Sequence, residues 1–135
     1  MSLEEMKAKI RWAGEEAWLK GNFDALDEVY APDYVWHRRP FPDLVGLDGV
    51  KASMTDMRIA YHEMVGEGDI IAYRYTWMGT HTGQSPTLPI PPTGKEVTLV
   101  GCIMVRVADG KIVEEFEYSD YLGFLQQIGV VPTLG

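Results

Sequence analysis

The sequence contains a single cysteine, few basic residues and no long apolar run. One cysteine, Cys102, excludes a disulfide framework and a zinc site built from cysteines. No stretch approaches the ~20 apolar residues that a membrane-spanning helix requires. The 12 Lys and Arg residues face 20 Asp and Glu residues, a formal net charge of −8. Because such a field repels polyanions, we expect neither a nucleic-acid partner nor a membrane partner.

Several kinds of site are also missing. The three histidines are scattered and show no HExxH-type spacing, so we expect no metal site. There is no GxSxG nucleophile elbow. Gly66 and Gly68 are followed by Ile71 where a dinucleotide-binding loop needs a third glycine, and a predicted strand follows instead of a helix. We therefore expect chemistry that needs no cofactor.

What is present suits one globular domain over residues 1–135. Hydrophobic residues make up 46% and charged residues 24%, close to the average for folded domains. A chain of this length holds one core and one modest cavity. The acidic N-terminus shows no signal peptide, and the absence of disulfides fits a reducing compartment, so we expect a cytoplasmic protein.

Hydrophobic periodicity predicts helices followed by strands. Apolar residues recur at three- and four-residue steps in the first part of the chain, and alternation takes over after about residue 61. We expect helices over 3–20, 22–30 and 47–61, strands over 34–37, 62–67, 70–82, 95–107 and 111–119, and a short closing helix over 121–128. Segregated helices and strands indicate an α+β fold, with helices on one face of a curved antiparallel sheet. The proline-rich segment 83–94 is either a rigid connector or the rim of a cavity.

The hairpin around Asp109-Gly110 determines which side chains share a face. With a three-residue turn and a glycine bulge, the even-numbered residues of both strands face the same way. That face is mostly apolar and would line a pocket, with Asp120 as its carboxylate: Thr98, Val100, Cys102, Met104 and Arg106 lie opposite Ile112, Glu114, Phe116, Tyr118 and Asp120. With a two-residue turn, Asp120 joins Leu99, Gly101, Ile103 and Val105, and Arg106 leaves the pocket.

Asp120 has two interpretations. In an apolar pocket, desolvation raises the pKa of a carboxyl group and makes its carboxylate a competent base. At the start of the closing helix, the same side chain is a natural N-cap.

A series of short motifs resembles the SnoaL-like polyketide cyclases (ester cyclases) of the NTF2-like superfamily. The motifs span about residues 10–130: 21–26 (GNFDAL), 30–35 (YAPDYV), 79–83 (GTHTG), 91–95 (PPTGK), 110–114 (GKIVE) and the closing Asp120, Gly123, Gln127 and Gly129. The resemblance implies a cone, in which three N-terminal helices pack on a strongly bent antiparallel sheet around an apolar pocket. It also implies a homodimer, and it assigns the general acid/base of the cyclases to Asp120.

Other residues are candidates for contact with a small hydrophobic substrate. Arg106 resembles a polar pocket position, where it would bind an enolate or carboxylate oxygen, unless it is solvated near the hairpin end. His37 shares a strand face with Val35, and either exchanges a proton with substrate or bonds the backbone. His81 alternates with Tyr73, Tyr75 and Trp77, so this face lines the pocket or packs elsewhere. Tyr118, Met104 and Phe116 complete the expected substrate-binding set.

Two functions remain open at this point. The first is an enzyme in which Asp120 removes a proton next to a carbonyl group, and His37, Tyr118 or Arg106 holds the enolate. A cyclase would then close a ring by intramolecular aldol attack, and an isomerase would return the proton elsewhere. The second is a non-catalytic module whose pocket binds a small apolar ligand or a partner.

Overall fold

The first helix follows directly from its sequence signals. A computed structural model describes residues 1–47, 57–81 and 91–134, and α1 covers Leu3–Lys20. Ser2 and Glu5 form a reciprocal capping box at its start, and Gly21 ends it with a φ of 72°. The predicted helix over 3–20 is confirmed. No helix among the described residues is long and apolar enough to cross a membrane.

The second and third predicted helices differ from the structure. Residues Phe23–Glu28 form a 3-10 helix, η1, because strand β1 (Tyr30–His37) begins directly after it. β1 is followed by the short strand β2 (Leu44–Val45). Of the helix predicted over 47–61, residues 48–56 lie outside the described residues, and 57–61 belong to strand β3 (Met57–Glu67). The helix prediction is therefore wrong for residues 57–61, although Met57 and Tyr61 continue the helical spacing of Val50 and Met54.

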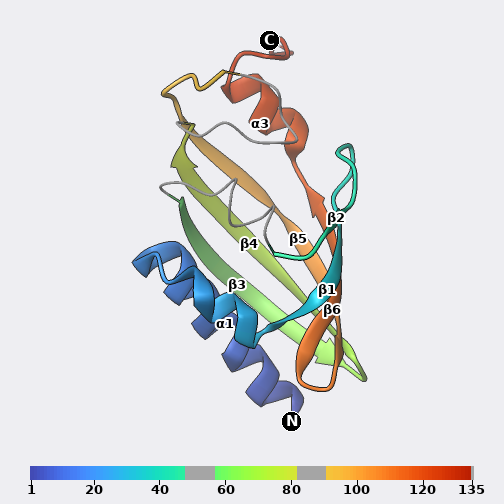
Figure 1. The fold of residues 1–135 in the computed structure, drawn as a ribbon. Helices are drawn as coiled ribbons and strands as arrows, with labels where there is room; N and C mark the ends of the chain where they lie inside the picture. The colour runs from blue at the N-terminus through green and yellow to red at the C-terminus, as the bar shows by residue number, and fades with distance from the viewer. Residues whose placement is uncertain (48–56, 82–90, 135) are drawn as a thin grey trace.

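The remaining three strands and the closing helix agree closely with the predicted elements. They are β4 (Ile70–Thr80), β5 (Glu96–Ala108), β6 (Lys111–Ser119) and the closing helix α3 (Tyr121–Gln127). One sheet contains six strands in the order β2-β1-β6-β5-β4-β3 (Figure 1). The described strands pair antiparallel, as expected, except that β1 pairs with β6 in parallel. The chain between β1 and β6 crosses the whole sheet, which gives the length that a parallel connection needs.

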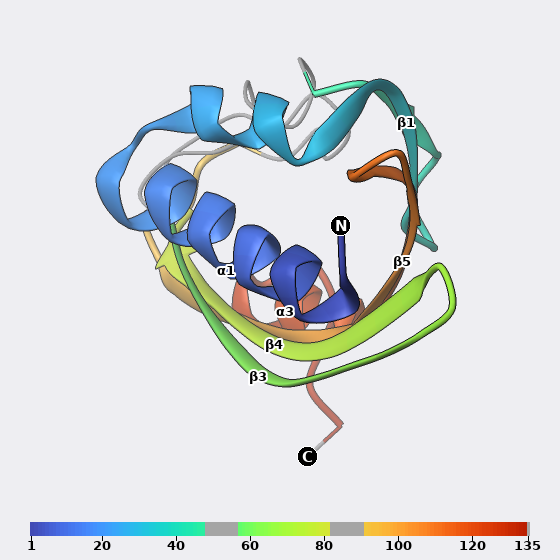
Figure 2. The same ribbon diagram turned by 90° about the horizontal axis from the view of Figure 1, so that it is seen from below.

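The sheet curls around α1, as the predicted cone requires (Figure 2). Buried residues of α1, including Met6, Ile10 and Ala17, share one core with Ile71 of β4 and Val105 of β5. Ile71 and Val105 are completely inaccessible to solvent. Full burial of an aliphatic side chain of this size contributes about 1.5–3 kcal/mol. The curl gives the sheet a concave inner face and a convex outer face.

The β5–β6 hairpin combines the two predicted registers. Its turn has two residues, Asp109 and Gly110, both with positive φ (53° and 74°), and Ala108 pairs with Lys111. A bulge at Arg106/Val107 then shifts the pairing, so that Arg106 lies opposite Glu114. From Arg106 and Glu114 away from the turn, even-numbered residues therefore share a face, as predicted for the three-residue turn. That face is the outer one, since the odd-numbered Val97, Leu99, Ile103 and Val105 are buried. Ile112, predicted on the same face, lies on the turn side of the bulge and is fully buried in the core.

Gly14 lies in the middle of α1, where Tyr61 of β3 packs against the helix backbone. A Cβ atom at Gly14 would collide with the Tyr61 hydroxyl group and come within 2.6 Å of two ring carbons. The Tyr61 ring cannot move away freely, since it packs on Tyr73 with 5.4 Å between the ring centroids. The glycine therefore sets the distance between α1 and β3.

We expect Gly14→Ala to lower the free energy of unfolding by about 1–3 kcal/mol, because overpacking outweighs the ~1 kcal/mol gain in helix propensity. Urea denaturation measures this change. In a Tyr61→Leu background the cost of Gly14→Ala should shrink. A Gly14→Ala protein more stable than the wild type would contradict the packing argument.

Candidate functional site

Two carboxylates of β6 point into the cone. Glu115 and Glu117 are 6% and 5% exposed, and both lie on the odd-numbered face that meets the core. An ionised carboxylate is costly to bury unless hydrogen bonds or opposite charges surround it. Their surroundings therefore determine what each can do.

Glu117 accepts hydrogen bonds from three side chains. Trp36 Nε1 of β1 donates to Oε1 over 3.0 Å, and the Tyr75 hydroxyl of β4 donates to Oε2 over 3.0 Å. The Tyr121 hydroxyl, at the start of α3, donates to the same Oε2 in a short bond. Three elements thus converge on one buried carboxylate. Burial, followed by the charge of Glu117, raises the pKa of both Tyr75 and Tyr121, which keeps the two hydroxyls protonated.

A glycine makes room for part of this network. The Ser119 hydroxyl hydrogen-bonds to the Tyr75 hydroxyl, and Ser119 lies opposite Gly101 in the sheet. A Cβ atom at Gly101 would come within 2.7 Å of the Ser119 backbone. A larger residue there would displace Ser119 and, through it, Tyr75.

Glu115 has a different environment. Burial, reinforced by the charge of Glu117, raises its pKa to about 8, although a hydrogen bond with Tyr30 opposes the shift. Tyr30 and Tyr73 have raised pKa values, chiefly because they are buried and secondly because of the Glu115 charge. At neutral pH Glu115 is therefore mostly protonated, and the two interior carboxyl groups differ in character.

Aromatic and cationic groups surround the Glu117 end of the interior. Arg38 is 6% exposed, and its guanidinium lies 4.8 Å from the Trp36 ring centroid. Phe41 packs edge-on against Tyr121, with 4.8 Å between the ring centroids. Trp77, two residues from Tyr75 on the same face of β4, packs against Phe124 of α3. The buried indole N–H of Trp77 makes no hydrogen bond with any described residue, so it is an available donor.

Asp120, the predicted acid/base, lies at the start of α3. Its side chain is exposed and accepts a 2.9 Å hydrogen bond from the Gly123 backbone N–H. Gly123 is suited to this cap, since a Cβ atom there would collide with the Asp120 carboxylate. The structure therefore confirms the interpretation of Asp120 as a helix N-cap. The expectation that Asp120 is buried in an apolar face is wrong. The role of Asp120 in catalysis stays a prediction.

The expected pocket face is corrected in the same way. Tyr118 is 68% and Met104 43% exposed, and Arg106 is exposed beside Glu114 and Asp69. Other predicted residues share this outer face and are half-buried: Val35, His37 and Phe116. The curl of the sheet turns their side of β1, β5 and β6 away from α1. Their roles in substrate binding stay predictions.

His81 lies apart from both groups, just beyond the end of β4. Its Nδ1 accepts a hydrogen bond from the Thr93 backbone N–H over 3.1 Å and contacts the Thr93 hydroxyl over 2.9 Å. Tyr73 and Tyr75, which share its predicted face, do point into the interior. The structure thus gives His81 a role in joining the chain after β4 to the chain before β5.

The interior carboxylates could have been found from one pattern. The odd-numbered positions of β5 are entirely apolar or glycine, whereas the even-numbered positions include Thr98 and Arg106. Glu115 and Glu117 pair across to that apolar set. Two acidic residues facing an apolar strand are a stronger sign of a buried site than Asp120 alone.

Two further features lie outside this interior site. A surface pocket of about 140 Å³ is lined by residues of β3, β4 and β5, among them Arg58, Thr80 and Glu96, and by none of the predicted site residues. Within the described ranges, no three His, Cys, Asp or Glu side chains form a metal-ligand set.

Comparison with known proteins identifies the family of the chain. The sequence profile of the SnoaL-like polyketide cyclases matches residues 8–128. The chain belongs to the SnoaL-like polyketide cyclase family. Membership of this family supports cyclase activity or a related activity. Relatives described as polyketide cyclases support an enzyme-like role.

Individual relatives agree with the fold. Aklanonic acid methyl ester cyclase from a Streptomyces species is 27% identical over 112 residues, which are 77% of this chain and 66% of that relative. A putative polyketide cyclase from Streptomyces antibioticus is 31% identical, with a TM-score of 0.67 over 93% of this chain and 99% of its own. A putative SnoaL-like cyclase from a Jannaschia species is 19% identical, with a TM-score of 0.78 over 98% of both chains, and shows the same fold.

The raised pKa of Glu115 makes stability depend on pH. Its folded pKa of about 8 lies above the ordinary 4.5, so folding takes up a proton. The stabilisation is complete below pH 4.5 and is lost as the pH rises to about 8, by up to about 1.4 kcal/mol per pH unit.

We expect Glu115→Gln, which mimics the neutral acid, to be more stable relative to the wild type at pH 8.5 than it is at pH 5.5. Urea denaturation at both pH values measures the difference. Glu67→Gln, at an exposed position of β3, is the matched control and should leave the difference unchanged. Parallel pH profiles for wild type and Glu115→Gln would show that Glu115 is ionised in the folded protein.

Proposed function

We propose that this protein catalyses cofactor-free proton transfer next to a carbonyl group, followed by aldol-type ring closure, inside the cone around Glu117. The observation that carries the proposal is the buried carboxylate of Glu117, on which Trp36, Tyr75 and Tyr121 converge. Catalytic carboxylates occur where a low-dielectric interior and fixed donors meet. The family of the chain supports the same class of reaction.

The proposed role of each side chain depends on whether it donates or accepts a hydrogen bond at Glu117. Tyr75 and Tyr121 both donate to one oxygen of Glu117. A substrate carbonyl oxygen that takes over one of these donors frees a lone pair on Glu117 Oε2, which then accepts the substrate proton. Trp77 lies one interior position along β4 from Tyr75, about 7 Å away at strand spacing. Its free indole N–H is a second donor for the oxygen on which the enolate charge develops.

The reaction balances without a redox partner. Glu117 takes the proton from the carbon next to the carbonyl, and the C–H electron pair moves onto the carbonyl oxygen as an enolate. The enolate carbon then attacks a second carbonyl of the same molecule and forms a carbon–carbon bond. The new alkoxide recovers the proton from Glu117, so substrate and product are isomers. Folding of the chain in the cone supplies proximity of the two carbonyl groups.

The proposed substrate is a hydrophobic polyketide ester with an enolisable carbonyl group. The 27% identical relative is named as the cyclase of a methyl ester, aklanonic acid methyl ester. Rings line the region around Glu117, among them Phe41, Tyr121 and Phe124. Such side chains suit a planar aromatic substrate.

The experiment compares two carboxylates. Aklanonic acid methyl ester serves as probe, and NMR follows exchange of its α-protons in D₂O, which detects enolate formation even if no ring closes. We expect Glu117→Gln to lower the exchange rate by about 10²–10⁴-fold, the usual contribution of an acid/base group. Trp77→Phe should lower it by about 10²-fold, the lower end of the usual effect of removing one oxyanion donor.

Asp120→Asn is the decisive comparison, because family resemblance assigns the base to Asp120. We expect this variant to keep most of the exchange rate, since Asn also caps helices. If Asp120→Asn abolishes exchange and Glu117→Gln does not, the proposed assignment is wrong and Asp120 is the base. If wild type and both variants bind the probe equally without exchange above background, the protein is a binding module and the proposal fails.

A further inference from the structure

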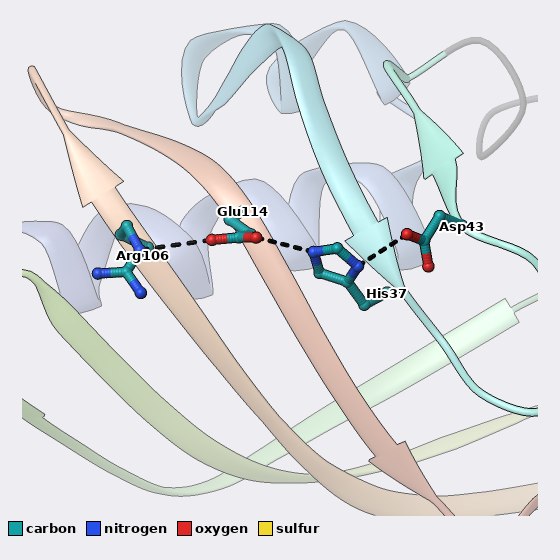
Figure 3. Close-up of polar contacts among 4 residues, drawn as sticks. All are labelled: His37, Asp43, Arg106 and Glu114. Carbon is teal, nitrogen blue, oxygen red and sulfur yellow. Dashed lines mark hydrogen bonds and ion pairs between the residues drawn. The ribbon is translucent and has the colours of Figure 1, made fainter.

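His37 lies on the outer face of the sheet between two carboxylates (Figure 3). Its Nδ1 is 2.9 Å from an oxygen of Asp43, and its Nε2 is 2.8 Å from an oxygen of Glu114. Ionised carboxylates only accept hydrogen bonds, so both ring nitrogens must carry a proton to satisfy both contacts. The geometry therefore calls for an imidazolium ion.

The groups around His37 favour this charged form. Glu114 of β6 also accepts a hydrogen bond from Arg106 Nε of β5 over 3.4 Å. Nη1 of Arg106 forms an ion pair with Asp69, just after β3, over 3.4 Å. Figure 3 shows Arg106, Glu114, His37 and Asp43 in one line across the strands. The Phe116 ring stacks on the imidazole with 4.8 Å between centroids. Hydrogen bonding to Glu114 is the largest cause that raises the pKa of His37 above its ordinary 6.5; burial opposes the rise, and the hydrogen bond to Asp43 adds to it.

Two residues between His37 and Asp43 contact the interior site. Arg38 stacks on Trp36, and Phe41 packs edge-on against Tyr121. Trp36 and Tyr121 are two of the three donors to Glu117. The segment is held together by bonds of its own: the Phe41 N–H donates to the Arg38 carbonyl over 2.9 Å, and Arg38 Nε donates to the Pro42 carbonyl over 3.1 Å. The six-residue connection 38–43 thus has two sides. On the outer side, the contacts of His37 with Asp43 and Glu114 form what we call the clamp. On the inner side, Arg38 and Phe41 contact the site.

We propose that His37 is a positioning residue: as an imidazolium ion it ties segment 38–43 to β6 and thereby holds Arg38 and Phe41 against the donors of Glu117. The inference rests on the proposed site around Glu117 for its functional meaning. The clamp itself is a matter of structure and is testable without turnover.

Loss of one proton opens the clamp on one side. A neutral imidazole donates from one nitrogen only, so the lone pair of the other nitrogen would face a carboxylate oxygen. Asp43 is the more exposed partner, with 55% of its side chain accessible against 33% for Glu114. The bond to Asp43 is therefore the one released to water. Because the pKa of His37 is raised, the clamp is complete below pH 6.5 and is lost as the pH rises through the higher folded value.

The test measures the backbone N–H of Phe41 by NMR hydrogen exchange, together with titration of the His37 ring. We expect the protection factor of Phe41 to fall about threefold to tenfold across the pH range in which His37 titrates, the effect of losing one partly exposed charge-assisted hydrogen bond. The N–H of Asn22, which donates to Glu16 at the end of α1, should show no such step.

Three variants separate the clamp from general effects of pH. His37→Gln does not titrate, so Phe41 should be weakly protected at every pH with no step. Asp43→Asn, at an exposed position that folding tolerates, should lower the His37 pKa and shift the step to lower pH. His62→Gln is the matched control, because His62 lies on β3, at the opposite edge of the sheet from β2, and its Nε2 contacts the Thr76 hydroxyl over 2.8 Å. It should leave the step unchanged.

The outcomes distinguish this proposal from the proposed function. If Phe41 protection follows His37 titration, the clamp stands even if Glu117→Gln retains activity. If Phe41 protection shows no step in the wild type, or if the step persists in His37→Gln, the clamp is refuted whatever the turnover. With both proposals correct, KM for the probe rises through the same pH range in the wild type and stays flat in His37→Gln, while kcat falls by a smaller factor.

Discussion

Strand β6 lies between β1 and β5, and the direction of its alternate side chains organises the rest of the molecule. The bulge at Arg106/Val107 sets this direction, because it adds one residue to β6 and so aligns Glu114 with Arg106. Glu115 and Glu117 consequently point into the cone, and Glu114 points outward. A slip of one residue would exchange the two faces and bury a different set of charges.

The two interior carboxyl groups illustrate how environment separates identical side chains. Burial, and then the charge of Glu117, raises the pKa of Glu115 to about 8. Glu117, two residues along the same strand, has three donors within reach. Such a pair provides a neutral acid and a hydrogen-bonded carboxylate side by side, which is a recurring basis for acid/base chemistry in proteins.

The interior site and the outer charge line are connected through β1. Trp36 of this strand and Arg38, directly after its end, are buried on the inner side, and His37 between them points outward. The alternation of a strand therefore places a titratable clamp directly behind two groups of the site. This close coupling explains how a side chain without access to the interior can influence it.

The sequence alone determined the family, α1, the strands β4, β5 and β6 and the closing helix, because periodicity, caps and turn residues are local signals. It did not determine which side of the sheet became the interior. Both faces of β5 and β6 carry apolar residues, and the choice depends on where α1 packs and how the sheet curls. Tertiary structure alone therefore moved Tyr118, Met104 and Arg106 outward, made Asp120 a helix cap, and brought Trp36, Tyr75 and Tyr121 to Glu117, since these contacts join residues up to 81 positions apart.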